Sequence, residues 1–207
     1  MGKTGGLIMQ EQDKKYLEKA AELQRAAEAV MAELEIRQRW GKVGKTILVG
    51  SARFGLMASP NLDFEIYVEE PDINVGFETI KEFANVPGVK QIQFLNFLGT
   101  DDPGLYWRID YEDANGTLWD IDNWLVPFSH PHAGMADGFA QAIQKALTET
   151  KKLTILQIKA CFSPEKKYRG IDIYKAVLQG GVTSAEEFEQ WIKENPPVPM
   201  ETWSPIV

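Results

Sequence analysis

Apolar positions at helical spacing fill the first forty residues. They recur three or four apart among Glu, Lys and Arg: Leu17, Ala20, Ala21, Leu23, Ala27, Val30, Met31 and Leu34. Such a pattern predicts one long amphipathic helix over residues 10–40. Gly41 and Gly44 follow and are expected to end it.

The pattern then changes to that of strands. Residues 46–49 form a short β-branched run, and residues 62–68 alternate, with Leu62, Phe64 and Ile66 on one face and Asp63 and Glu65 on the other. The stretch 51–59 between them has room for a turn or two of helix, which Pro60 would break.

The remaining pattern predicts a helix near residues 77–84, a strand within "VKQIQFLNFLG", and a hairpin joined at Asn115-Gly116, a favoured tight-turn pair. Beyond Pro127 and Pro131 come four helical segments, near residues 136–150, 153–162, 171–178 and 185–194. Ser184 and Glu187 form a capping box for the last segment, and an extended arm follows it. This order predicts an α/β (α+β) fold, with a head over residues 1–130 and a helical C-terminal region over residues 131–207.

Composition is that of a soluble globular protein, with 207 residues, 44% of them hydrophobic and 25% charged. No apolar run approaches the roughly 20 residues that span a bilayer, so no membrane partner is expected. The apolar run near the N-terminus is too short for a signal-peptide core. Cys161 is the single cysteine, which rules out an internal disulfide and favours the reducing cytoplasm. We expect it to be a small buried hydrophobe.

Charge is unevenly distributed around a net value of −8. From residue 63 to 122 fourteen acidic residues stand against three basic ones, whereas residues 151–169 are mainly basic. Overall acidity argues against binding long nucleic acid through its phosphates, so nucleic acid is not expected as a partner. An acidic half suits a cation site, and a basic patch facing it would suit a polyphosphate. The alternative for the basic run is a solvated helix face.

Two pairs of acids have the spacing of a divalent-metal site. Asp63 with Glu65, and Asp120 with Asp122, each lie two apart on a predicted strand and so point to one face. Mg²⁺ takes oxygen ligands and is held by carboxylates together with substrate phosphates. The other explanation of Asp63 and Glu65 is a solvated strand face.

The turn after the first strand can bind an anion. Gly50 lets the backbone come close to a phosphate, the Ser51 hydroxyl and the following N–H groups can donate to it, and Arg53 adds a fork of donors. A purely structural turn is the alternative for Gly50-Ser51.

Together these residues resemble a known family. "VGS", eleven further residues, "DFEI" and the later "WDI" are similar to the nucleotidyltransferase superfamily of DNA polymerase beta, aminoglycoside nucleotidyltransferases and toxin–antitoxin nucleotidyltransferases. The resemblance covers roughly residues 46–126 and implies a mixed β-sheet flanked by helices. It also implies Mg²⁺ or Mn²⁺ and an NTP, with Ser51, beside Gly50 and Arg53, at the nucleotide phosphates. Asp63 and Glu65 would then be metal ligands and Asp120 both a ligand and the base, with Asp122 beside it.

Two assignments stay open within this resemblance. "PNLD" offers another register, with Asn61 and Asp63 in place of Asp63 and Glu65, which would remove one ligand. Asp110, Asp120 and Asp122 all have the small pattern expected of the third acid. The first register favours a bacterial-type enzyme that transfers a nucleoside monophosphate to a hydroxyl on a small molecule or protein, and the second favours a degenerate binding module. A homodimer is compatible with either.

Three further features have a structural explanation beside a functional one. The "HPH" of His130 and His132 is typical of a polar linker more than of zinc ligands, and the tryptophans Trp107, Trp119 and Trp124 of core filling more than of base stacking. "YRGIDIYKAVL" is similar to a helix that follows the catalytic head in abortive-infection-type nucleotidyltransferases. That similarity implies a place near the substrate for Lys166, Arg169 and Asp172.

Overall fold

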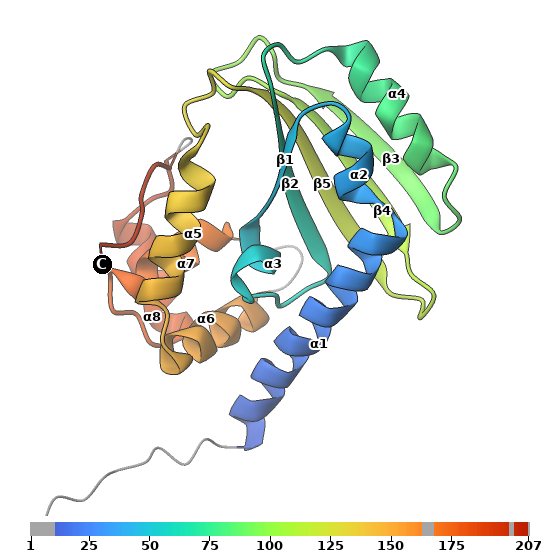
Figure 1. The fold of residues 1–207 in the computed structure, drawn as a ribbon. Helices are drawn as coiled ribbons and strands as arrows, with labels where there is room; N and C mark the ends of the chain where they lie inside the picture. Colours follow the sequence, from blue (N-terminus) through green and yellow to red (C-terminus); the bar gives the residue numbers. More distant parts are fainter. Residues whose placement is uncertain (1–10, 163–167, 199–200, 207) are drawn as a thin grey trace, which may run out of the picture.

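The computed structural model describes residues 11–162, 168–198 and 201–206. Its elements follow in this order: α1 (Glu11–Glu33), α2 (Ile36–Gly41), β1 (Lys45–Val49), α3 (Gly50–Phe54), β2 (Asn61–Val68), α4 (Ile73–Ala84), β3 (Val89–Asn96), β4 (Leu105–Glu112), β5 (Leu118–Pro127), α5 (Met135–Ala146), α6 (Glu149–Cys161), α7 (Gly170–Leu178) and α8 (Ala185–Glu194). Figure 1 traces this order through the fold. The predicted α/β class, a mixed sheet flanked by helices, is confirmed.

The five strands form one mixed sheet in the order β1-β2-β5-β4-β3. β2 and β5 are parallel, and the other neighbours are antiparallel. The predicted hairpin is confirmed as β4 and β5, and its Gly116 has φ 79°, a conformation that favours glycine.

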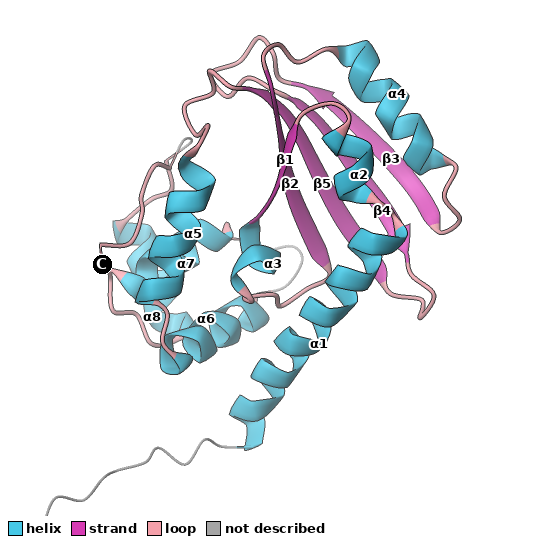
Figure 2. Cartoon of the chain, viewed as in Figure 1, coloured by secondary structure: helices cyan, strands magenta, loops and turns pink. Residues whose placement is uncertain are grey.

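The two faces of the sheet have different surroundings. On one face Phe64, Trp107 and Ile121 pack against α1, α2 and α4 and are fully buried. The helices α5 to α8 lie on the other side of the molecule (Figure 2) and build a second core around Ile158 and Phe188, which Leu56, just after α3, joins. The acid-bearing face of the sheet lies between these two packing units.

The single helix predicted for residues 10–40 is wrong, because the chain breaks after Glu33. Glu35 adopts a left-handed conformation, with φ 50°. The turn between the helices allows Leu34, Ile36 and Trp40 all to be buried in the sheet core. One straight helix would carry these positions around its circumference and expose some of them.

α1 contacts both packing units. Its second half places Val30 and Met31 in the sheet core, while its first half packs against α6, where Gln157 Nε2 donates to Asp13 Oδ1 at 2.9 Å. One helix therefore joins the sheet to the helical region.

Three expectations in the C-terminal half change. Thr148 caps a new helix by accepting from Lys151 N, so the segment predicted to end near Thr150 ends at Ala146. Cys161 is exposed, not buried, because it ends α6. His130 is not part of a solvated linker, since it is buried and hydrogen-bonded to Asp102. The division of the chain near residue 130 remains a prediction.

A buried amide joins α2 to the middle of the sheet. Trp40 Nε1 donates to Asn123 Oδ1 at 2.8 Å, and Asn123 Nδ2 donates to the carbonyls of Ile121 and Trp107. Asn123 is fully buried. Its polar atoms therefore depend on these partners, because water cannot replace them.

We predict that Trp40→Phe lowers the free energy of unfolding by at least about 1 kcal/mol more than Trp119→Phe, because it leaves a buried carbonyl oxygen unpaired. Both tryptophans are fully buried and lose the same volume. The Trp119 indole instead donates to Asp113, which is partly exposed and accepts two backbone N–H groups as well. Urea denaturation measures both variants, and equal losses would contradict the prediction.

Candidate functional site

The parallel pairing of β2 with β5 places acids on neighbouring strands side by side. Asp63 is in register with Asp122, and Asn61 with Asp120. Because side chains alternate along a strand, all four point to the face away from the sheet core. The sequence-predicted acids of the two strands are therefore brought together, with Asp63 and Asp122 as directly opposed partners.

The carboxyl groups of Asp63 and Asp122 influence each other. Burial, and then the charge of Asp122, raise the pKa of Asp63 to about 7. Burial also raises the pKa of Asp122, although hydrogen bonds from Tyr106 and Asn61 oppose the shift. Two like charges in a low-dielectric site are a place where a cation binds favourably.

Glu65 lies two residues beyond Asp63 on β2, on the same face of the sheet. It is in register with Trp124 rather than with an acid. Its Oε2 accepts from the Tyr67 hydroxyl at 2.5 Å. Glu65 also contributes to raising the pKa of Asp63, so its charge is felt at the acid pair. It thus flanks that pair on one side.

Asp120 flanks the pair on the other side and has a basic partner. Arg108, on β4, is in register with Asp122 and reaches Asp120 with Nη2 and Asp110 with Nε. Tyr106, also on β4, donates its hydroxyl to Asp122 Oδ1 at 2.5 Å. All three candidates for the third acid therefore lie on one face, with Asp122 nearest in register to Asp63.

Gly50 and Ser51 begin α3, and Gly50 lies against the Asp63 carboxylate. Gly50 has φ 66°, and a Cβ atom there would lie 2.3 Å from Asp63 Oδ2, so only glycine fits. The backbone of this turn thus touches the carboxylate. Ser51 lines the same cleft, whereas Arg53 is already engaged, with Leu48 O at 3.3 Å and Asp137 at 2.6 Å.

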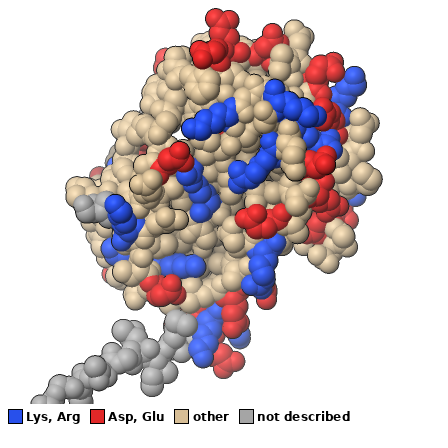
Figure 3. Space-filling model, in the orientation of Figure 1, with Lys and Arg blue, Asp and Glu red and all other residues tan. Residues whose placement is uncertain are grey.

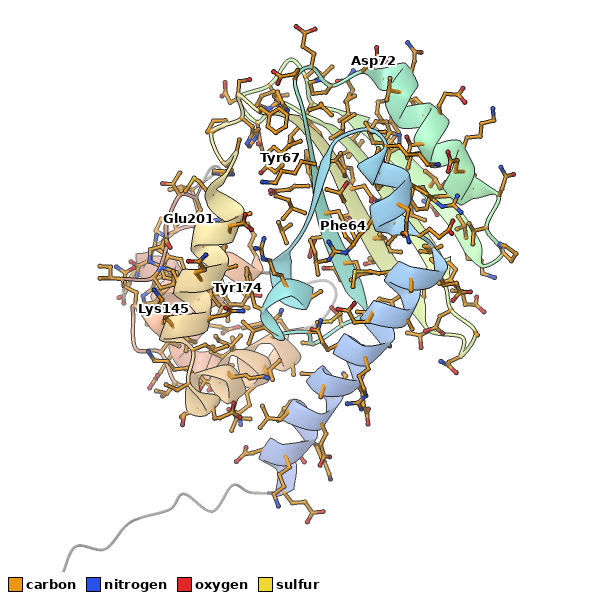
Figure 4. All side chains as sticks on the ribbon, viewed as in Figure 1. Phe64, Tyr67, Asp72, Lys145, Tyr174 and Glu201 are labelled. Atoms are coloured by element: carbon orange, nitrogen blue, oxygen red, sulfur yellow. The ribbon has the colours of Figure 1, made fainter. Side chains whose placement is uncertain are left out.

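These residues line one cleft of about 1220 Å³ between the sheet and the helical region. Its far wall includes Lys159 of α6, Tyr174 of α7 and Trp203 of the C-terminal arm. Figure 4 shows Tyr67 on the sheet side and Tyr174 and Glu201 on the helical side. The volume exceeds the 300–1,000 Å³ typical of small-ligand pockets, so the cleft has room for a nucleoside triphosphate.

The sequence did not reveal Lys159 as a site residue. Lys159 Nζ donates to Leu56 O at 2.8 Å and lies 5.7 Å from the centre of the Tyr174 ring. Burial lowers its pKa to about 8, while the charge of Asp63 acts in the opposite direction. The basic run was visible, but only the packing of α6 singles out this lysine. Tyr106 and Arg108 were missed likewise, since strand register places them.

The segment "YRGIDIYKAVL", residues 168–178, contributes to a neighbouring wall of the cleft. Arg169 lines the cleft and pairs with Asp172 through Nε and Nη2, at 2.8 and 2.7 Å. Asp172 is buried. Lys166 lies outside the described residues. The role that the resemblance implies for this motif stays a prediction.

Charged side chains of both signs line the cleft, among them Asp63, Asp120, Arg108 and Lys159. Figure 3 shows acidic groups along the edge that carries α4 and β3, and basic groups nearer the middle of the same face. The net charge of −8 therefore does not describe the surface as a whole.

The donors present suit a hard divalent cation that also binds a ligand. Within residues 11–162, 168–198 and 201–206, no three His, Cys, Asp or Glu side chains converge tightly enough to hold a metal by themselves. Mg²⁺ is, however, commonly held by one or two carboxylates with phosphate oxygens and water completing its shell. Asp63 and Asp122 fit that arrangement.

The fold is similar to that of solved poly(U) polymerase structures, so the predicted resemblance is confirmed at the level of fold. A single-residue variant of the Cid1 poly(U) polymerase bound to MgATP matches with TM-score 0.55 and 15% identity over 81% of this chain and 55% of the other. Another Cid1 poly(U) polymerase structure gives 0.52 and 13% over the same shares, and the MgGTP-bound form 0.50 and 15% over 72% and 47%.

This chain spans about half the length of those structures. No family model and no curated protein matches its sequence. No helix in the described part of the chain is long and apolar enough to cross a membrane. At this level of identity the likeness concerns the fold alone.

We predict that Gly50→Ala lowers the free energy of unfolding by more than Gly55→Ala does. Both residues flank α3 with almost the same φ, 66° and 68°, so the backbone strain of about 1–2 kcal/mol is shared. Only Gly50→Ala also pushes a methyl group into Asp63, because the nearest atom to a Cβ at Gly55 is 3.8 Å away. Chemical denaturation compares the variants, and a Gly55→Ala loss as large as that of Gly50→Ala would contradict the argument.

Proposed function

We propose that this protein transfers a nucleoside monophosphate from an NTP to a hydroxyl acceptor, with Mg²⁺ or Mn²⁺. The observation that carries the proposal is the opposed pair Asp63 and Asp122 directly beneath the Gly50-Ser51 helix start. Carboxylates for a cation and the Gly50-Ser51 turn, which would bind a phosphate, thus line one cleft.

The roles follow from position. Asp63 and Asp122 would hold the cation, with Glu65 and Asp120 on either side of them, and the cation would supply charge stabilisation at the phosphates. Of the three candidates for the third acid we favour Asp122, because Asp120 and Asp110 both pair with Arg108. Ser51 and the first N–H groups of α3 would bind the triphosphate, together with Lys159 across the cleft.

The chemical step requires the acceptor to be held in line. The acceptor oxygen bonds to the α-phosphorus, the bond to the bridging oxygen breaks, and pyrophosphate leaves with the electron pair. The hydroxyl proton passes to Asp122, which takes the role that the resemblance gives to the third acid, since Asp120 is already paired with Arg108. Excluding water and orienting the two substrates would supply most of the rate gain.

Two observations bear on the acceptor and point to different classes of molecule. Net acidity favours a small molecule or a protein, whereas the solved structures with this fold include a poly(U) polymerase. These solved structures therefore do not support the expectation that nucleic acid is not a partner.

A second candidate is a catalytically degenerate module that binds nucleotide without transferring it. Asn61, which lies in register with Asp120 and 3.4 Å from Asp122, is the observation that favours it. In that register an amide occupies a position where an active relative would need a carboxylate.

We predict that saturating Mg·NTP raises the melting temperature of the wild type and that Asp63→Asn and Asp122→Asn lose most of the rise. At a ligand concentration of 100 Kd the stabilisation is about 2.7 kcal/mol, or roughly 5–10 °C for a chain of this size. Glu112→Gln, which removes an exposed carboxylate of β4 paired with Lys90, is the control and keeps the rise. A thermal-shift screen of the four NTPs measures the rise in melting temperature for the wild type and for each variant.

The same samples separate the two candidates. Pyrophosphate release that depends on Asp63 supports the enzyme, and nucleotide binding without release across a broad acceptor panel supports the module. If no NTP with Mg²⁺ or Mn²⁺ stabilises the wild type, the proposal fails.

We also predict that Lys159→Met weakens Mg·NTP binding by about ten- to a hundredfold, since a hydrogen bond to a charged group contributes about 1.5–3 kcal/mol. Lys152→Met, on the same helix but outside the cleft lining, is the control. Titration by calorimetry gives both dissociation constants. Equal affinities in the two variants would remove Lys159 from the nucleotide site.

A further inference from the structure

β3 is the last strand of the sheet and has a free edge. It pairs with β4 on one side, and in the part of the chain that the structure describes no strand pairs with its other side. Figure 1 shows β3 and α4 at the outer edge of the molecule, away from the helices α5 to α8. The outward N–H and C=O groups of β3 are therefore open to another chain.

This edge has little protection against pairing with another strand. Natural edge strands commonly carry charged residues or prolines, but residues 91–100 contain neither, although Gln91, Gln93 and Leu95 are exposed. A bulge between Val89 and Gln91 lies at the start of the strand and leaves residues 91–96 regular. The part of β3 that can pair is therefore uncharged along its whole length.

One flank of α4 continues this edge as an apolar strip. Phe77 contacts Phe94 of β3, with ring centroids 4.8 Å apart, and yet is 43% exposed. Ile73, one turn before Phe77 on the same flank, is 37% exposed. The opposite flank faces α2, where Glu82 pairs with Lys42. The two exposed apolar side chains therefore lie on the outer flank, beside the free edge.

The charges next to the strip are paired within the chain. Lys90 lies 3.2 Å from Glu112, and Lys81 lies 3.4 Å from Glu78. The strip is thus neutral, although the whole chain carries a net charge of −8. A strongly charged partner would find no complementary charge there, whereas a second copy of this chain can approach along the strip without bringing like charges together.

The spacing of the layers also suits a second copy. In an antiparallel pair of β3 strands, six residues from each copy exchange roughly six hydrogen bonds. Each α4 lies over its own β4, where Gly76 packs against Trp107, and the two β4 strands would be three strand spacings, or about 14 Å, apart. Helices in contact are about 8–10 Å apart. Phe77 and Ile73 of the two copies can fill the remaining space.

We propose that the free edge of β3 is a self-association surface. Residues 91–96 pair antiparallel with the same residues of a second copy, and Ile73 and Phe77 of both copies pack together across the two-fold axis. Two five-stranded sheets become one, and both clefts open on the same side of it. The paired edge is only about 20 Å long, so the dimer is reversible, with a dissociation constant on the order of micromolar.

Sedimentation equilibrium of the full chain tests this surface, with a reducing agent present because Cys161 is exposed. The variants are Leu95→Lys in β3 and Ile73→Lys in α4. Val75→Lys is the matched control, because Val75 is 45% exposed in the same turn of α4 but lies on the flank that faces α2. Circular dichroism and the melting temperature in dilute solution show that each variant is folded.

We expect the wild type and Val75→Lys to reach twice the chain mass of 23.3 kDa as the concentration rises. In Leu95→Lys and Ile73→Lys the dissociation constant should rise about tenfold or more, because each dimer would bury two added charges. Hydrogen exchange gives a second measurement. The amides of residues 91–96 should gain protection with concentration, whereas those of residues 45–49, at the other edge of the sheet, should not.

A wild type that keeps the mass of a single chain up to about 200 μM, far above a micromolar dissociation constant, would overturn the inference and leave the edge to a different protein partner. Equal weakening by Val75→Lys and Ile73→Lys would do the same, as would a dimer whose β3 amides exchange as fast as in the monomer. None of these outcomes bears on nucleotide binding, so the transferase proposal is tested separately.

Discussion

The parallel pairing of β2 with β5 is the constraint on which the site depends. It brings together two strands that are far apart in the sequence and sets Asp63 directly against Asp122. A shift of one residue would turn one member of each pair toward the core. The hydrophobic alternation prevents that shift, because Phe64 and Ile121 must stay on the face covered by α1, α2 and α4. The packing of the core thus fixes the geometry of the acids.

The strands and the hairpin were predictable because their cause is local. Leu62, Phe64 and Ile66 alternate with polar residues, and Asn115-Gly116 supplies the turn that joins β4 to β5. The break at Glu35 was not predictable, since it arises from the need to bury residues on either side of it in a core made by distant strands. Cys161 was misjudged for a related reason: whether it is buried depends on where α6 ends.

The same division applies to the candidate site. Gly50, Ser51 and Asp63 could be found from spacing, because the turn and the strand after it are close together in the sequence. The spacing of Asp120 and Asp122 on one later strand marked both as candidates. Lys159 could not be found in this way, because its proximity to Asp63 depends on how α6 packs against the sheet. Nor could spacing rank Asp120 against Asp122, a distinction made by the guanidinium of Arg108 on the next strand.

α1 has a consequence for how the cleft forms. The helix is anchored in the sheet core at one end and against α6 at the other, through Asp13 and Gln157. The two walls of the cleft are therefore braced against each other along a route that does not pass through the cleft itself. The distance between them is set during folding, so little of a ligand's binding energy would be spent on drawing the walls together.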